Sequence, residues 1–249
     1  MRVLVFELEK QKQQKHSNTK TRKHYLETFS NAGTFAEKGR LFRGKAVYQP
    51  EPTSMILPIH VYGDPILRVE TQDVEADSEG LQQLLDDMYE TMRGAAGIGL
   101  AAPQVGRTER LFLVDLSPLL DDLEEEQREA LPPQPMVFIN PEILWESDEE
   151  MEFEEGCLSI PDLRENVVRP ERIRIAYLDR NFQEQEVEVG SLLARVIQHE
   201  YDHLDGVLFI DLISSFRRSL IKRRLREMAR GNVEADYPIT FGPNGEDKS

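Results

Sequence analysis

The two histidines in QHEYDHLDG, residues 198–206, constrain this chain more than any other feature of its sequence. His199 and His203 lie four residues apart, so on an α-helix both imidazoles share one face and can reach one metal ion. Glu200 follows the first histidine and can hold a water molecule beside such an ion. An apolar stripe over residues 192–197 precedes the motif, which predicts a helix over residues 192–203.

A third metal ligand is needed, because two histidines leave a catalytic metal centre incomplete. The only cysteine of the chain is Cys157, in EEGCLSIP, residues 154–161. A single cysteine excludes an internal disulfide and is commonly a small buried apolar residue, so this interpretation stays open. However, one thiolate, two imidazoles and one water would complete a catalytic set with an open fourth position.

The third segment is the glycine-rich GIGLAAPQVG, residues 97–106. Its small residues permit a tight backbone next to another group, although a flexible connector would have the same composition. A dinucleotide-binding loop is disfavoured, because no strand precedes the segment and Pro103 interrupts the helix that should follow.

In this order, the three segments resemble the three signature motifs of the peptide deformylase family. The resemblance runs from about residue 55 to about residue 210, and more weakly to about 235. Peptide deformylases remove the formyl group from the N-terminal formyl-methionine of newly made bacterial polypeptides and release formate. The resemblance therefore implies a metallohydrolase that acts on N-formyl-methionyl nascent peptides. The departures from the family pattern are an N-terminal extension and the acidic segment 117–135.

The resemblance also implies the metal centre. By motif, Cys157, His199 and His203 would be the ligands. These ligand types alone would favour zinc. The family instead points to iron(II) as the physiological ion, with less active zinc forms, so we expect Fe²⁺ with Zn²⁺ as a substitute.

Three residues take catalytic roles by the same resemblance. Glu200 would be the general acid and base. Gln104 would donate a hydrogen bond from its side-chain amide to the formyl oxygen, and the backbone N–H of Leu158 would be the second oxyanion donor.

Substrate-binding residues are expected on both sides of the metal ligands. The resemblance implies that Ile98 and Gly99 pair backbone groups with the substrate chain, as an added strand does. Leu192 and Val196 precede His199 on the predicted helix and could line a pocket for the methionine side chain, with Ile98 opposite. Plain core packing is the alternative for these apolar side chains.

The patterning predicts an α+β fold: antiparallel sheets packed around a central helix that carries the HExxH motif, with an N-terminal helix and a basic C-terminal helix. Segments 94–106 and 117–135 are predicted loops. The predicted helices cover residues 78–92, with Ser78 as N-cap, 192–203 and 215–230. The predicted strands cover residues 110–116, 136–144, 172–179 and 185–190.

Charge changes sign near residue 54. Residues 1–54 hold 11 Lys and Arg against 5 Asp and Glu, whereas the rest holds 19 against 41. We expect residues 1–54 to be a disordered basic extension or a mis-called start before Met55, 55–235 to be the catalytic domain, and 236–249 to be a flexible tail. A transit peptide is disfavoured, because the segment is poor in serine and contains glutamates.

Composition also bears on partners and location. The net charge of −16 argues against a DNA partner, which would require a broad basic face. The chain has no apolar run long enough for a membrane span and no signal-peptide core, so we expect no membrane partner and a cytoplasmic location.

The basic helix 215–230 is the exception to the acidic composition. Residues 214–230 carry seven Lys and Arg and one Glu. A solvated helix face would explain them, but weak docking to ribosomal RNA would suit an enzyme of nascent chains and resembles a role of the C-terminal helix in this family.

Two other function classes share part of the pattern. A metalloprotease would share the HExxH motif, but it would usually take a His or Glu as third ligand. A non-catalytic ribosome-associated binding module would keep the basic helix but would not need the metal ligands. Both alternatives predict no hydrolysis of formyl-methionyl peptides.

Overall fold

The computed structural model describes residues 54–123 and 125–242. These residues belong to one compact unit, and a second unit, residues 5–48, lies outside the described residues. We predicted that residues 1–54 form a disordered extension or a mis-called start. Of these residues, only Ser54 belongs to the described part of the chain. Among the described residues, no helix has the length and apolar character that a membrane crossing requires.

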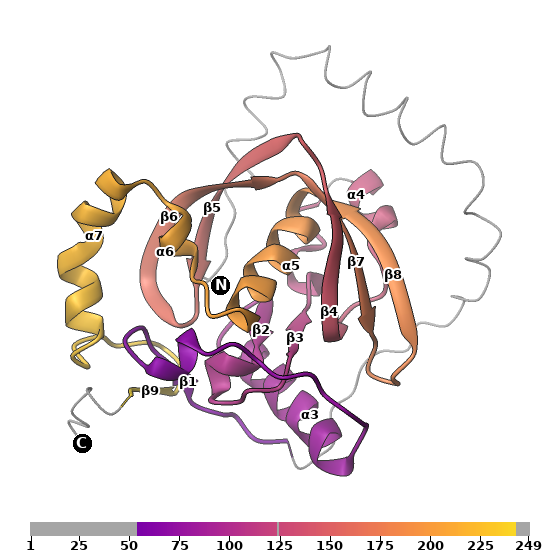
Figure 1. Ribbon diagram of the computed structural model, residues 1–249, viewed down its shortest axis with the longest axis horizontal. Coiled ribbons are helices and arrows are strands. Elements are labelled where there is room, and N and C mark those ends of the chain that lie inside the picture. The colour runs from indigo at the N-terminus through magenta and orange to yellow at the C-terminus, as the bar shows by residue number, and fades with distance from the viewer. Residues whose placement is uncertain (1–53, 124, 243–249) are drawn as a thin grey trace. The chain divides into compact units, whose positions relative to one another are not determined.

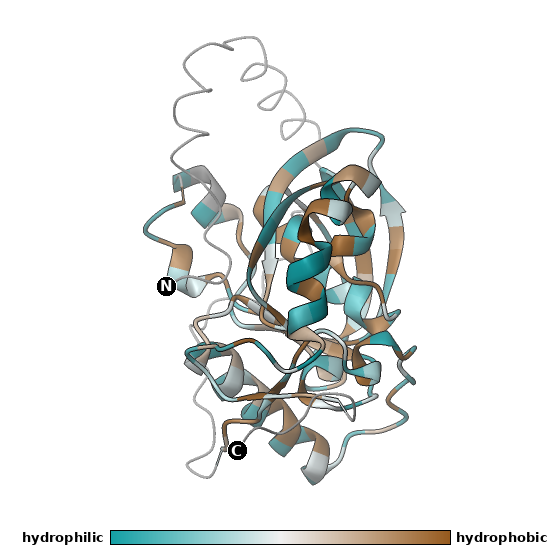
Figure 2. Ribbon diagram, turned by 90° about the vertical axis from the view of Figure 1, so that its left-hand side faces the viewer, coloured by the Kyte–Doolittle hydropathy of each residue, from teal (hydrophilic) through white to brown (hydrophobic). Residues whose placement is uncertain are grey.

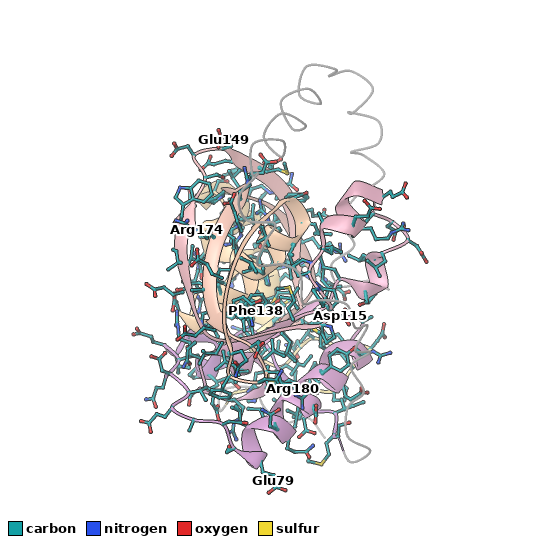
Figure 3. All side chains as sticks on the ribbon, turned by 90° about the vertical axis from the view of Figure 1, so that its right-hand side faces the viewer. Glu79, Asp115, Phe138, Glu149, Arg174 and Arg180 are labelled. Carbon is teal, nitrogen blue, oxygen red and sulfur yellow. The ribbon has the colours of Figure 1, made fainter. Side chains whose placement is uncertain are left out.

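A five-stranded antiparallel sheet forms the larger layer (Figure 1). Four of its strands were predicted from apolar or alternating segments, and the fifth lies in the glycine-rich segment 97–106. Phe138 points into the core from this sheet, whereas Arg174 lies at its outer surface (Figure 3). In spatial order the strands are β2 (Gly99–Ala101), β3 (Leu111–Val114), β4 (Met136–Glu146), β7 (Arg172–Leu178) and β8 (Glu184–Gly190).

The three predicted helices are present as α3 (Glu79–Gly94), α5 (Ser191–Leu204) and α7 (Ser215–Met228). The hydroxyl of Ser78 caps α3 by accepting a hydrogen bond from the N–H of Leu81 at 3.1 Å. Helix α5 packs against β2, β3, β7 and β8. The shorter helical segments are η2 (Pro65–Arg68), η3 (Ala102–Val105), η4 (Ser117–Leu119), α4 (Glu125–Ala130) and α6 (Phe209–Leu212).

A long hairpin, β5 (Glu150–Cys157) with β6 (Ile160–Pro170), was not predicted. Its two strands pair antiparallel and stand apart from the five-stranded sheet. Phe153 and Val167 face each other in this pairing and are both buried. The hairpin delivers Cys157 at its turn, so it is as important to the site as α5.

Two segments predicted as loops contain regular structure. The glycine-rich segment 94–106 forms β2 and η3 rather than a loop throughout, since its small residues allow it to pair with β3. The acidic segment 117–135 contains η4 and α4 and is not wholly solvated. Its side chains Leu119 and Leu123 are buried, and they anchor the segment to the domain.

The C-terminal segment also differs from the expected flexible tail. Strand β9 (Ile239–Thr240) pairs in parallel with β1 (Ile59–His60). Residues 236–242 are therefore part of the folded domain, and residues 243–249 lie outside the described residues. Two residues of strand carry too little periodicity to be recognised from sequence, and only their partner strand reveals them.

Candidate active site

Three predicted metal ligands converge from two elements. His199 and His203 lie one turn apart on α5, and Cys157 lies at the end of β5. All three are buried, and one ligand atom from each lies within 4.8 Å of the others. The Sγ of Cys157 is 3.2 Å from the Nε2 of His203. A cluster of this kind requires both the helix and the hairpin.

A buried carboxylate orients the first histidine. The Nδ1 of His199 is 2.8 Å from the Oε2 of Glu155, which is fully buried. Because a carboxylate accepts hydrogen bonds, Nδ1 carries the proton of the imidazole and donates a hydrogen bond to Glu155. The lone pair of Nε2 is then available to the ligand cluster, as in other metal sites that have a carboxylate behind the histidine.

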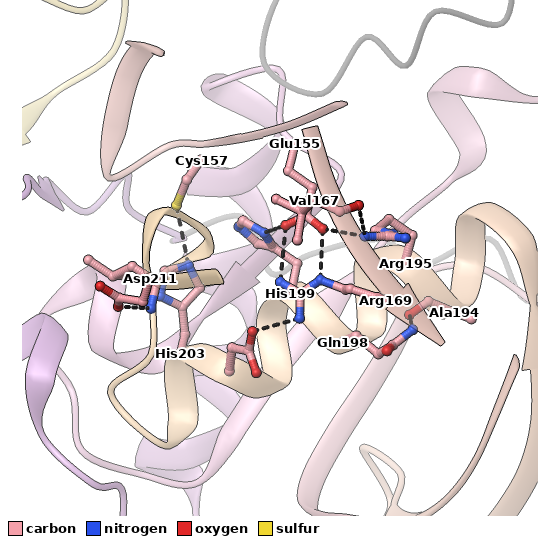
Figure 4. A network of polar contacts seen from close by, with 12 residues as sticks. Glu155, Cys157, Val167, Arg169, Ala194, Arg195, Gln198, His199, His203 and Asp211 are labelled. Atoms are coloured by element: carbon pink, nitrogen blue, oxygen red, sulfur yellow. Dashed lines mark hydrogen bonds and ion pairs between the residues drawn. The ribbon is translucent and has the colours of Figure 1, made fainter. Parts of the chain in front are cut away.

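Two arginines bind the same carboxylate (Figure 4). Arg169 from β6 donates through Nε at 2.7 Å and Nη2 at 3.1 Å, and Arg195 from α5 donates through Nη1 at 2.8 Å. Burial acts to raise the pKa of Glu155, but the charge of Arg169 and the hydrogen bonds from His199 and Arg169 outweigh it, so the pKa lies well below its usual range. Glu155 is therefore an ion at neutral pH.

Glu200 lies beside the ligands in an almost completely buried position. Burial raises the pKa of its carboxyl group to about 7, which suits a group that must both accept and release a proton near neutral pH. Among the described residues, its Oε2 has no hydrogen-bond partner. The backbone of Gly99 passes so close that a Cβ atom there would lie 2.3 Å from the Oε1 of Glu200.

The side chain of Gln104 is fixed with its amide nitrogen toward the cluster. Its Oε1 accepts a hydrogen bond from the N–H of Ala101 at 2.8 Å. This leaves Nε2 3.5 Å from the Sγ of Cys157 and 3.3 Å from the Oγ of Ser159. The amide is thus held as a donor that faces the ligands.

Four other predicted site residues are all buried: Ile98, Leu158, Leu192 and Val196. The pairing of Ile98 backbone groups with a substrate chain stays a prediction. The carbonyl of Ile98 already accepts a hydrogen bond from the N–H of Asp115 at 2.9 Å, because the sheet pairing continues beyond β2. Strand β2 is nevertheless the edge of the sheet, which leaves one side of Gly99 unpaired by any described strand.

The sequence analysis missed Glu155, Arg169 and Arg195. Charged residues are usually exposed, so nothing in their spacing marks them as buried. The available signal was the position of Glu155 within EEGCLSIP, two residues before the cysteine.

The donor set fits a divalent transition-metal ion. A thiolate and two imidazoles, buried and mutually close, match the ligands that such ions prefer. The carboxylate of Glu155 orients the imidazole of His199 through a hydrogen bond, as is usual at metal sites. Together with the adjacent carboxyl of Glu200 on an HExxH helix, these residues define a metal-dependent hydrolase.

Comparison with known families specifies which hydrolase. Residues 56–219 match the family model of polypeptide deformylase, so this chain belongs to the peptide deformylase family. These are metal-dependent enzymes that remove the N-formyl group from formyl-methionyl nascent peptides. This match supports neither a metalloprotease nor a non-catalytic binding module.

Individual relatives agree with this assignment. Peptide deformylase of Salinibacter ruber is 65% identical over 185 residues, which is 74% of this chain and 94% of the relative. That of Flavobacterium psychrophilum is 48% identical over 191 residues, or 76% of this chain and 98% of the relative.

Solved structures match as well. A crystal structure of a peptide deformylase from Legionella pneumophila has a TM-score of 0.61 at 38% identity and covers 70% of this chain and 96% of its own. The Ehrlichia chaffeensis enzyme in complex with actinonin has a TM-score of 0.62 at 36% identity, with 70% and 97% covered. The mixed fold with antiparallel sheets is that of this family.

The buried carboxylate leads to a first prediction. In Glu155→Gln, the buried guanidinium of Arg195 loses its counter-charge and that of Arg169 keeps only Asp202, so the free energy of unfolding should fall by about 3–5 kcal/mol. Less metal should also remain bound, because the amide holds the Nδ1–H of His199 more weakly. Chemical denaturation and metal analysis would measure both effects.

A matched control is Glu186→Gln on β8, whose carboxylate lies 3.7 Å from Arg174 at the surface. Exposed ion pairs contribute little, so this variant should behave almost like the wild type. Equal destabilisation by the two substitutions would show that the buried network has no special role.

Proposed function

We propose that Cys157, His199 and His203 bind the metal ion of the deformylase reaction in this chain and that Glu200 transfers the protons. The observation that supports this proposal is the convergence of the three ligand atoms within 4.8 Å, beside a buried carboxyl group. The substrate is the formyl-methionyl end of a nascent polypeptide.

The reaction needs an activated water and a polarised formyl group, since a formamide is a weak electrophile. When bound, the metal ion supplies Lewis-acid chemistry that lowers the pKa of water and polarises a carbonyl group. The carboxylate of Glu200 accepts a proton from the attacking water. It then gives this proton to the amine nitrogen as the C–N bond breaks, which yields formate and a free N-terminal methionine.

Two donors would stabilise the developing oxyanion. The Nε2 of Gln104 is one, and the bond from Ala101 to its Oε1 fixes its direction before substrate arrives. The backbone N–H of Leu158, at the hairpin turn, is the second. By analogy with other oxyanion holes, each donor contributes about 3–4 kcal/mol to transition-state stabilisation.

The substrate chain would add to the edge of the sheet at Gly99. The glycine allows the substrate backbone and Glu200 to approach each other, since any Cβ there would collide with the carboxylate. Ile98 would contribute its N–H or its side chain, and Val196 and Leu192 on α5 would line the methionine pocket.

Removal of the proton carrier tests this mechanism. Glu200→Ala should retain the metal and lose at least a hundredfold in kcat on a formyl-Met-Ala peptide, because no other described carboxyl group takes this position. Metal content and turnover should be measured on the same sample, with acetyl-Met-Ala as a substrate that must stay intact. A kcat within tenfold of wild type would contradict the assignment.

For the metal, we propose iron(II), with zinc as a less active substitute. Anaerobically purified protein should contain iron in near-equimolar amount, and its activity should decline in air as the thiolate and the iron oxidise. Cys157→Ser should retain much less metal, since an alcohol is a poorer ligand than a thiolate for these ions. Unchanged metal content in Cys157→Ser would return this cysteine to a packing role.

We also propose a weak ribosome contact through α7. Arg218, Lys222 and Arg226 recur every four residues and line one groove of about 460 Å³ with Tyr62. Two arginines of the helix form ion pairs with the domain: the Nε of Arg217 lies 2.7 Å from Glu165, and the Nη2 of Arg218 lies 2.8 Å from Asp211. Figure 2 faces the side that carries α7 and shows hydrophilic residues interspersed with hydrophobic ones. Such a basic row fits a phosphate backbone.

The double variant Lys222→Glu with Arg226→Glu should lose co-sedimentation with ribosomes at about 50 mM salt and keep its turnover of a free formyl dipeptide. The control Arg174→Glu also replaces a cation by a carboxylate, but it does so on β7, outside the residues that line the groove. This variant should still co-sediment with ribosomes. If the wild type does not co-sediment, or if the double variant binds equally well, α7 is only a solvated face.

Location and domain extent complete the proposal. An enzyme of nascent formylated chains is expected in the cytoplasm, where these chains are made. The catalytic domain is expected to begin at Met55, whose backbone N–H donates to Asp87 at 2.8 Å, and the pairing of β9 supports an end near residue 242 rather than 235.

A further inference from the structure

The turn of the β5–β6 hairpin, residues 157–160, is buried and brings together three groups of the site. We call these residues the hairpin tip. The tip contains the ligand Cys157, the donor Leu158 and Ser159, whose hydroxyl meets Gln104. Its backbone direction therefore bears most directly on the proposed oxyanion donor, the N–H of Leu158.

Both carbonyls in the middle of the tip are held from outside the hairpin. The N–H of Tyr62 donates to the carbonyl of Ser159 at 2.8 Å. The phenol of Tyr237 donates to the carbonyl of Leu158 at 2.7 Å. These two tyrosines follow β1 and precede β9, which are the two strands that pair with each other.

Tyr237 is itself fixed by that pairing. The N–H of Ile59 donates to the carbonyl of Pro238 at 2.9 Å, and the N–H of Val61 donates to that of Thr240 at 3.0 Å. Ile239 packs against the buried cluster that includes Cys157. Burial raises the pKa of the Tyr237 phenol, so it remains a protonated donor throughout the physiological range.

We propose that Tyr237 is a positioning residue for deformylation: by holding the Leu158 carbonyl, it fixes the hairpin tip and aims the Leu158 N–H at the oxyanion. Tyr237 lies beyond residues 56–219, so the family match does not assign it a role. The catalytic part of the proposal rests on the donor role of Leu158 given above. A donor stabilises a transition state fully only when its direction is set in advance.

Tyr237→Phe removes the hydroxyl and keeps the ring, which makes it the direct test. We expect kcat on formyl-Met-Ala to fall roughly three- to tenfold, the range of one hydrogen bond, with KM nearly unchanged. Amide hydrogen exchange should become faster in residues 157–160 and stay unchanged in the five-stranded sheet. Metal content and Tm should stay close to wild type.

The matched control is Tyr177→Phe on β7, which also removes a partly buried hydroxyl. The ring centroid of Tyr177 lies 4.3 Å from that of Phe138 in the five-stranded sheet. Tyr177→Phe therefore removes a hydroxyl from the sheet rather than from the hairpin tip. This variant should leave both kcat and the exchange of residues 157–160 unchanged.

The outcomes separate this inference from the proposed function. Unchanged exchange in residues 157–160 of Tyr237→Phe would overturn the positioning role. Faster exchange at the tip with unchanged kcat would uphold the anchoring by Tyr237 and overturn the donor role of Leu158. Equal losses of Tm and kcat in both tyrosine variants would reduce Tyr237 to general packing.

Discussion

The buried carboxylate of Glu155 is the interaction on which the rest of the site depends. It lies on β5, and it binds Arg169 on β6 as well as Arg195 and His199 on α5. The hairpin and the helix each supply proposed metal ligands, and this buried carboxylate is central among the polar contacts between them, which include the ion pair of Arg169 with Asp202. Because removing a charge from water is costly, such a group persists only when every partner is in place, so the network tolerates a single arrangement of the two elements.

The network also relates stability to chemistry. Glu155 is held as an ion by its cations. Glu200 follows the histidine that Glu155 binds, its Oε2 has no hydrogen-bond partner in the described part of the chain, and burial raises its pKa to about 7. Two buried carboxyl groups in one region therefore behave differently, and the difference is set by neighbouring charges. One is suited to hold structure and the other to exchange protons.

Sequence reasoning was strongest where one periodicity or one motif determined the outcome. The helices and four strands of the main sheet have clear apolar patterns, and the ligands stand in distinct motifs. The β5–β6 hairpin was missed because Glu155 and Arg169 occupy inward positions where alternation calls for apolar residues. Strand β9 was missed because two residues carry no pattern. The engagement of the Ile98 carbonyl by Asp115 follows from register, which only the assembled sheet defines.

The pairing of β1 with β9 joins the early and late parts of the described chain, and Ile239 of β9 packs against the buried cluster that includes Cys157. Polypeptides are made from the N-terminus onward, so Tyr237 and Ile239 are among the last described residues to leave the ribosome. A growing copy of this enzyme has all three proposed ligand residues before it has the phenol of Tyr237, which holds the turn of the β5–β6 hairpin. The Leu158 carbonyl can therefore gain this hydrogen bond only after synthesis has passed residue 237.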